Sequence, residues 1–264
     1  MKKSMKILAL AGAVLCSGAM MVGCGGNGDL VDTKGNYVPA SQTSVNAQTY
    51  VDEMDNATTE QNYKIKVKSS INSSEANIDF TANGVVGESG LYFDSTAKGN
   101  YTSLAISANV DYAMTYYYET AEQMCYVNLK GANKPEIKKA TSLAGLTDEE
   151  LPVDTENFSP ESLKETLDSL GLTDENLAIS QQGGTTKLKY ALNDELMGNY
   201  EFCLIFDESG FYGAKMTCTM TTDGTSVSQE VQMVRTNEAV KTLSADQKSE
   251  YAVVSVKDFE KLFA

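Results

Sequence analysis

Few side chains of this chain are suited to catalysis. The sequence of 264 residues contains no histidine and no tryptophan. This removes the commonest general base, the commonest metal ligand and every triad or dyad that needs an imidazole. No cysteine pair has the spacing of a zinc site, and the sequence has neither a phosphate-binding glycine loop nor a calcium loop. We therefore predict no catalytic residues, no metal site and no cofactor.

Two acidic clusters are the remaining candidates for carboxylate chemistry. Asp52-Glu53-Asp55 falls on the face of a predicted helix, and Asp148-Glu149-Glu150 falls in a predicted connection. Paired carboxylates can act as acid and base in a glycosidase, but solvated surface charge explains both positions more simply. The sequence thus favours a protein that is not an enzyme.

The start of the chain has the layout of an export signal. Three lysines among the first six residues precede an apolar or small-residue run over 7–21. A positive region followed by such a run is typical of a cleaved signal peptide, and the run is too short for a comfortable membrane span. We predict a signal peptide over residues 1–23.

Cys24 is the residue whose surroundings predict a modification. The stretch Met21-Val22-Gly23-Cys24 resembles the lipobox of bacterial lipoproteins, although Met21 stands where leucine is usual. Cys16 fits less well because the bulky Leu15 precedes it. The resemblance implies that Cys24 carries fatty acids such as palmitate on a diacylated sulfur, and that it becomes the first residue of the mature protein. An ordinary cleaved signal followed by an incidental cysteine is the alternative.

Composition limits the partners. Removal of residues 1–23 takes away three lysines and no acidic residue, which leaves 18 basic against 36 acidic residues and a formal charge of −18. Such a surface repels nucleic acid and anionic lipid headgroups, so the acyl chains on Cys24 must supply the attachment to the membrane. The expected location is the cell membrane, with the chain outside the cytoplasm. The protein partner is left open.

The other cysteines of the mature chain are predicted to stay reduced. A turn at residues 207–210 would pair Phe206 with Phe211, and hence Cys203 with Ala214. Cys218 would then lie four residues further along the same face, about 13 Å away, which exceeds the reach of a disulfide. We interpret Cys203, Cys218 and Cys125 as small buried hydrophobic residues.

A polar segment and a helix come first in the mature chain. Residues 24–43 are rich in Gly, Asn, Ser and Thr without apolar periodicity, which indicates a flexible tether. Ala47, Tyr50, Val51, Met54 and Ala57 then form one apolar stripe of an amphipathic helix.

Two runs of alternating segments follow. The first contains Tyr63 to Lys68, whose alternating lysines predict a strand with one solvated face. Its predicted strands cover 63–68, 78–82, 91–96, 100–110, 113–119 and 123–129. A long connection over 130–158 and a helix over 160–170 separate it from the second run, whose predicted strands cover 177–181, 185–192, 200–206, 211–221 and 226–235. A helix capped at Ser244, a strand over 251–256 and a last helical turn with Phe259 end the chain.

Methionine and tyrosine on these strands suggest a surface for an apolar ligand. Alternation places Tyr212, Ala214, Met216, Cys218 and Met220 on one face, and a turn at Asp223-Gly224 brings Val227, Val231 and Met233 to the same face. Thioethers adapt their shape and phenols provide a polar edge, so together they can line a hollow. The candidate ligand-binding residues are Tyr212, Met216, Met220, Val231 and Met233; ordinary packing against helices is the alternative.

The lipobox, the tether, the first helix and the large meander together resemble the LolA/LppX-like lipoproteins. The resemblance implies an α+β fold in which a large curved antiparallel sheet forms a half-barrel, with a few helices on one face, in a single domain over 44–264. It also implies that the hollow holds acyl chains. Only Cys24 can be transferred from the family as a functional residue.

Two functions remain open at this point. The first is a membrane-anchored protein that binds or carries a lipid or another apolar molecule. The second is a structural or protein-interaction module of the cell envelope with a solid core. A continuous internal cavity would favour the first function, and an exposed apolar patch over a filled core would favour the second.

Overall fold

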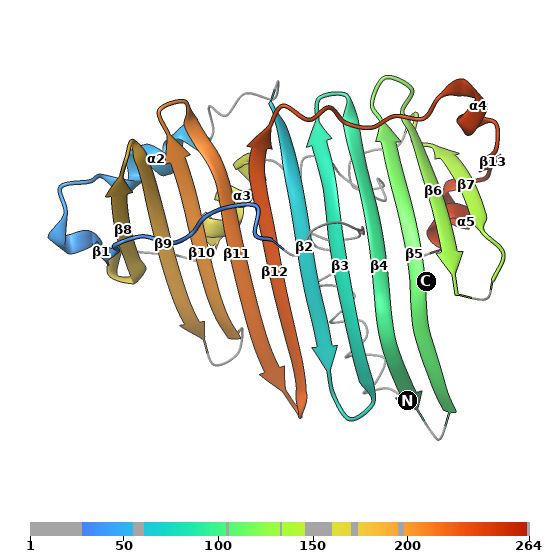
Figure 1. Ribbon diagram of the computed structural model, residues 1–264, viewed down its shortest axis with the longest axis horizontal. Helices are drawn as coiled ribbons and strands as arrows, with labels where there is room; N and C mark the ends of the chain where they lie inside the picture. The colour runs from blue at the N-terminus through green and yellow to red at the C-terminus, as the bar shows by residue number, and fades with distance from the viewer. Residues whose placement is uncertain are drawn as a thin grey trace.

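The computed structural model describes residues 28–54, 61–103, 106–132, 134–145, 160–169, 174–194 and 198–262. These residues form one open sheet of 13 strands with a few short helices (Figure 1). The predicted α+β fold with a large antiparallel sheet is confirmed, since every strand pair is antiparallel except β7 with β13. The predicted signal peptide and Cys24 lie outside the described residues.

Two meanders lie side by side in this sheet. The first consists of β2 (Asn62–Asn72), β3 (Ala76–Gly87), β4 (Gly90–Ser103), β5 (Ile106–Glu119), β6 (Met124–Gly131) and β7 (Ile137–Ser142). The second consists of β8 (Leu177–Gln182), β9 (Thr185–Asp194), β10 (Gly198–Asp207), β11 (Gly210–Thr222) and β12 (Thr225–Thr236). The last strand of the second meander, β12, pairs with the first strand of the first meander, β2, and this pairing makes the two one sheet.

Very short strands close both edges of the sheet. β1 (Val38–Pro39) pairs with β8, and β13 (Ala252–Val253) pairs in parallel with β7. A short edge strand with a proline offers few free backbone groups to another chain. The predicted strand over 251–256 is thus reduced to two residues, because the chain turns into α5 at Val256.

Two strand predictions in the first meander are wrong. Residues 106–119 form the single strand β5, in which Asp111 pairs with Lys98 and Tyr112 pairs with Ala97, so no turn lies between 110 and 113. Residues 100–103 of the predicted strand over 100–110 belong to β4. β7 lies inside the predicted long connection over 130–158. Its sequence has little alternation, and it becomes a strand because β6 pairs with it along Ile137–Ser142.

The helices follow the predicted apolar stripes. They are α2 (Ala47–Glu53), α3 (Pro160–Ser169), α4 (Ala245–Lys248) and α5 (Val256–Glu260), with the 3-10 turns η1 (Ala40–Gln42) and η5 (Asp174–Asn176). Asn46 caps α2, whose Ala47 and Val51 are buried. The predicted capping box of Ser244 and Gln247 at the start of α4 is present. Ala57 of the first predicted helix and residue 170 of the second lie outside the described residues.

The sheet has two faces with different coverings. The helix face packs on α2, α3 and α5, whose Val51, Leu167 and Phe259 join the main apolar core. The outer face is crossed by residues 28–39 and by residues 237–244, which Figure 1 shows in blue and red in front of the strands. Val31, Val240 and Leu243 are the buried hydrophobic residues that these two segments place on the outer face.

A β-bulge in the β10–β11 hairpin corrects the predicted register. Phe206 pairs with Phe211 as predicted, but the register shifts between Ile205 and Phe206, so Cys203 pairs with Lys215 and not with Ala214. The extra residue in β11 moves Tyr212 to the outer face, where it packs with the cluster of Val31. The turn at Asp223-Gly224 is as predicted: both residues have positive φ, 50° and 76°, as a two-residue hairpin requires.

The same register explains why the cysteines are free. Cys203 is on the outer face, 3.3 Å from the Tyr37 hydroxyl, whereas Cys218 is opposite Tyr200 on the helix face. Two cysteines on opposite faces of a sheet cannot form a disulfide. Cys125 is fully buried beside the Tyr116 hydroxyl, and Cys218 is half-buried.

We expect the thiols of Cys125, Cys203 and Cys218 all to be free when denatured protein is alkylated without reductant and analysed by mass spectrometry. In the native protein Cys218 should react first. Burial raises the pKa of the Cys125 thiol to about 12, which leaves little of the reactive thiolate near neutral pH. A disulfide between any two of the three residues would show that the register described here is wrong.

Candidate functional site

The helix face changes from a packed core to a partly exposed apolar surface along the strands. The row formed by Leu204, Ala214, Met233 and Ile65 is buried throughout. In the next row toward the β11–β12 turn, Phe202 and Val67 are buried, but Met216 and Val231 between them are half-buried.

The row nearest this turn is apolar and only half-buried. Its members are Met220, Val227, Ile71 and Ile78, which pair directly across β11, β12, β2 and β3. We call these four residues the apolar row. The row between it and the packed core contains Cys218, Gln229, Ser69 and Phe80. None of the four residues of the apolar row belongs to the main apolar core.

The described helices cover the other end of the sheet. Tyr50 of α2 packs on Phe206 with 5.3 Å between the ring centroids, and its hydroxyl accepts a hydrogen bond from Thr186. In Figure 1, α2, α3 and α5 lie behind the upper part of the sheet, whereas the β11–β12 turn is at its lower end. Within the described residues, no helix lies behind the apolar row.

The five predicted ligand residues are therefore divided among four environments. Met216 and Val231 face each other at the margin of the core, and Met220 belongs to the apolar row. Met233 is part of the packed core, only 7% exposed. The prediction for Tyr212 is wrong about the face, because the bulge places it on the outer side.

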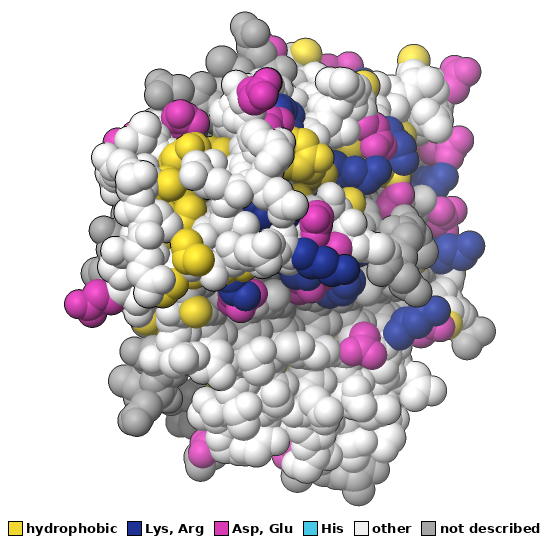
Figure 2. All heavy atoms as spheres, turned by 60° about the vertical axis from the view of Figure 1, so that its left-hand side comes forward, with side chains coloured by type: hydrophobic (Ala, Val, Ile, Leu, Met, Phe, Trp, Pro, Cys, Tyr) yellow, Lys and Arg dark blue, Asp and Glu magenta, His cyan; other side chains and the backbone are white. Residues whose placement is uncertain are grey.

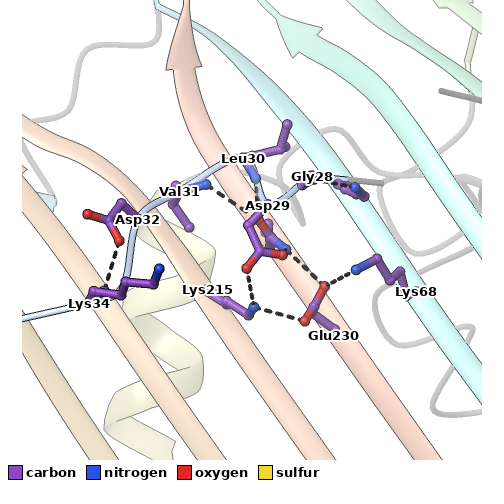
Figure 3. Close-up of polar contacts among 11 residues, drawn as sticks. Gly28, Asp29, Leu30, Val31, Asp32, Lys34, Lys68, Lys215 and Glu230 are labelled. Atoms are coloured by element: carbon purple, nitrogen blue, oxygen red, sulfur yellow. Dashed lines mark hydrogen bonds and ion pairs between the residues drawn. The ribbon is translucent and has the colours of Figure 1, made fainter. Parts of the chain in front are cut away.

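The outer face carries a second arrangement, which sequence reasoning missed. Residues 28–34, here called the N-terminal segment, lie across β11, β12 and β2 (Figure 3). Val31 is 3% exposed and packs on Ile205 and Val234. Gly213 leaves space for it: a Cβ at Gly213 would lie 3.1 Å from a Val31 methyl group. The prediction of a flexible tether over 24–43 is thus wrong for residues 28–43. The N-terminal segment and β1 both lie in this range, and both contact the sheet.

Gln232 of β12 binds the N-terminal segment through both the oxygen and the nitrogen of its side-chain amide. Its Oε1 accepts hydrogen bonds from the backbone N–H groups of Leu30 and Val31 at 2.6 and 3.4 Å. Its Nε2 donates to Asp29 at 3.0 Å and to Glu230 at 2.9 Å. Gln232 is fully buried and each of these bonds satisfies one of its polar atoms.

Lysines connect the same segment to the sheet. Lys215 Nζ lies 3.1 Å from Asp29 and 2.9 Å from Glu230, and Lys68 forms an ion pair of 2.9 Å with Glu230. Lys66 Nζ donates to the Gly28 carbonyl at 2.5 Å and is only 5% exposed. The predicted solvated face of β2 is therefore correct for Lys64 and Lys68 but wrong for Lys66, which the N-terminal segment covers.

These contacts lower the pKa values of two carboxyl groups. Hydrogen bonds from Gln232 and Lys215 lower the pKa of Asp29. Burial alone would raise the pKa of Glu230, but hydrogen bonds from Lys68, Lys215 and Gln232 outweigh it, and the pKa is lowered. Both groups therefore favour the docked segment in their ionised form.

In the described part of the chain, His, Cys, Asp and Glu side chains form no group that could hold a metal ion. The same residues include no helix long and apolar enough to cross a membrane.

We expect Gln232→Leu to release the N-terminal segment while the sheet stays folded, because the backbone N–H groups of Leu30 and Val31 lose their acceptor. NMR signals of these two amides should move toward unstructured shifts, and a protease should cleave the segment faster. Lys64→Ala is the matched control, since Lys64 forms an exposed ion pair with Glu238, outside the segment. Unchanged Leu30 and Val31 signals in Gln232→Leu would contradict the assigned role.

Acid should release the same segment. Carboxyls with lowered folded pKa values stabilise the docked form above the ordinary carboxyl pKa of about 4, and this contribution is lost as the pH falls through the lowered values. The Leu30 and Val31 signals should therefore shift below about pH 4, before the core strands unfold. In Asp29→Asn this pH dependence should be reduced.

Comparisons with known proteins leave the family open. No protein-family model matches the chain, and no curated protein matches it. Two solved structures are similar to parts of it. One is a DUF1329 family protein from Desulfovibrio piger ATCC 29098, which is 11% identical, with 75% of this chain and 93% of that chain covered and a TM-score of 0.22. The other is the ywiB protein from Bacillus subtilis, which is 12% identical, with 69% and 98% covered and a TM-score of 0.17. At these TM-scores neither similarity carries an argument about function.

Proposed function

We propose that the protein is a membrane-anchored lipoprotein of a bacterial cell envelope that binds an acyl chain or a similar apolar ligand on the helix face of its sheet. The apolar row of Met220, Val227, Ile71 and Ile78 is the observation that carries the ligand part. Cys24 in its lipobox-like context carries the anchor part.

The position of the apolar row supports a binding surface. Each side chain pairs directly with its neighbour across four strands, at about 4.8 Å between strands, which gives a continuous apolar strip about 15 Å long. The half-buried state of all four residues leaves apolar area that a ligand can cover, and each Å² so covered is worth about 25 cal/mol. Met220 can adapt its shape to varied chains.

The LolA/LppX-like resemblance agrees with this proposal in architecture. The chain has an open sheet with helices on one face, and each of its meanders follows a helix, α2 before β2 and α3 before β8. In that family the ligand occupies the side of the sheet that the helices cover. The helix face is the corresponding side here.

A solid interaction module is the second candidate. Ile65, Leu204, Phe93 and Val127 on the helix face are fully buried, which shows that this part of the core is filled. In this alternative the apolar row contacts another protein. Ligand binding therefore separates the two candidates.

Cys24→Ser should release the protein from the membrane fraction or leave its precursor unprocessed, because the acylated sulfur is lost. Cys16→Ser is the matched control and should leave both processing and membrane association unchanged. Membrane fractionation and intact-mass measurement provide the readouts. A Cys24→Ser protein that is processed and fractionates like the parent would overturn the anchor proposal.

Met220→Gln and Ile71→Asn should weaken the binding of a fluorescent fatty acid by about tenfold or more, which corresponds to about 1.4 kcal/mol. Their effect on stability should be smaller than that of Met233→Ala, which should cost about 2–5 kcal/mol because Met233 is in the packed core. Thr219→Gln is the matched control: Thr219 is the exposed neighbour of Met220 on the outer face. Titration and urea unfolding measure the two quantities.

Two results would decide against a ligand. A parent protein that binds no fatty acid and yields no lipid on extraction would favour the interaction module. Equal loss of binding in Thr219→Gln and Met220→Gln would show that the dye binds elsewhere.

A further inference from the structure

We propose that the outer face of the sheet is the surface that faces the membrane, lying over the phospholipid headgroups, with the helix face directed away from them. This inference rests on the proposed lipid anchor at Cys24. It follows from the place where the chain leaves the sheet, together with the charge of the outer face.

The N-terminal segment fixes the exit point of the anchor. Lys66 Nζ binds the Gly28 carbonyl, and Gln232 binds the N–H of Leu30, so the chain reaches the sheet over β12 and β2. In the strand order of the sheet, five strands lie beyond β12 toward one edge, and six lie beyond β2 toward the other edge. Gly28 is therefore held near the middle of the outer face.

The covalent chain between Cys24 and Gly28 is too short to reach the helix face. Four residues span at most about 14 Å, even when fully extended. The nearer side edge is five strands away, about 24 Å at about 4.8 Å per strand.

The chain between Gly28 and Cys24 is also too short to reach the helix face around the ends of the strands. Gln232 is four residues from the end of β12 at Thr236, about 13 Å, so reaching that end would use the whole span. The opposite end of β12, at Thr225, is seven residues away, about 23 Å. Within this span, an acylated Cys24 would reach the membrane only on the outer side of the sheet, so we infer that the membrane lies on that side.

The outer face is also less acidic than the rest of the molecule. On its rows between β11 and β5, five lysines are matched by five acidic residues, in a mature chain with a formal charge of −18. The lysines are Lys64, Lys66, Lys68, Lys98 and Lys215, and the acidic residues are Asp79, Asp94, Asp111, Glu119 and Glu230. The segments 28–34 and 237–244, which cross this face, add Asp29, Asp32 and Glu238 against Lys34 and Lys241. A face this close to neutral can approach headgroups with little of the repulsion that the other surfaces meet.

The end of the outer face near the β11–β12 turn is uncharged and polar. Its last row consists of Thr221, Ser226, Asn72, Asn77, Asn100 and Asn109. Figure 2 shows the corresponding contrast: charged side chains gather in a belt, and the lower part of the molecule carries mostly uncharged side chains and backbone. Uncharged hydrogen-bonding groups suit contact with hydrated headgroups.

The test uses the full lipidated protein in phosphatidylcholine vesicles that contain some lipid with a nitroxide on its headgroup. A fluorophore is attached at Thr81→Cys or Thr219→Cys, two exposed outer-face positions, or at Glu165→Cys, an exposed position on α3 behind the helix face. Cys218, the half-buried native thiol, is replaced by Ser. We expect strong quenching by the nitroxide at Thr81→Cys and Thr219→Cys, with little at Glu165→Cys.

A longer linker is the matched control. Insertion of about twelve Gly and Ser residues before Gly28 adds an average span of about 19 Å, which should reduce the difference in quenching between the two faces while membrane attachment persists. Equal quenching at the three positions of the parent protein, or stronger quenching at Glu165→Cys, would overturn the proposed orientation. Recovery of the parent protein in the soluble fraction would contradict the anchor itself and so remove both proposals.

Discussion

The pairing of β12 with β2 is the interaction on which the rest of the structure depends. It runs from Ser226 opposite Asn72 to Thr236 opposite Asn62, and it joins two meanders that are otherwise separate hairpin series. Contacts between residues this distant in sequence close a large loop, so their formation has a high entropic cost that the whole ladder must offset. Val231 opposite Val67 and Met233 opposite Ile65 supply apolar burial at this junction. The helix face and the outer face are each continuous only because this pairing exists.

An open sheet of this width has two edges and two faces to protect. The edges end in the two-residue strands β1 and β13, which limit pairing with other chains. On the outer face, Val240 and Leu243 of the segment after β12 cover Tyr92 and Tyr126, and Lys248 at the end of α4 forms an ion pair of 2.6 Å with Glu119. The segments before and after the strands, residues 28–39 and 237–244, thus both cover the outer face of the sheet.

Local patterns predicted the second meander and the helices well, because those elements depend on near neighbours. Alternation between good turns, such as Asp223-Gly224, defined β11 and β12, and the helix predicted over 160–170 is α3. The bulge that moved Tyr212 was not visible, since one extra residue in a strand leaves the alternation on either side intact. The docking of residues 28–34 was missed because it depends on Gln232 and Lys215, about 200 residues away in the sequence. Within residues 28–34 themselves, Leu30 and Val31 are the only apolar side chains, too few to indicate a buried segment. The pairing of β12 with β2 could not be predicted either, because the alternation in each strand shows which side chains are buried but does not identify the neighbouring strand.

The N-terminal segment would connect the proposed anchor at Cys24 to the sheet. Ordering a glycine-containing segment costs about 1–2 kcal/mol per residue in conformational entropy, so its contacts must be extensive. The segment makes them at one place, where Val31 fits over Gly213 and where Gln232, Lys66 and Lys215 each bind it. A flexible linker of the same length would let the domain rotate freely over an anchored cysteine. A docked segment restricts that rotation. The contacts that bury Gln232 would therefore also fix the direction in which the helix face, with its proposed ligand surface, points.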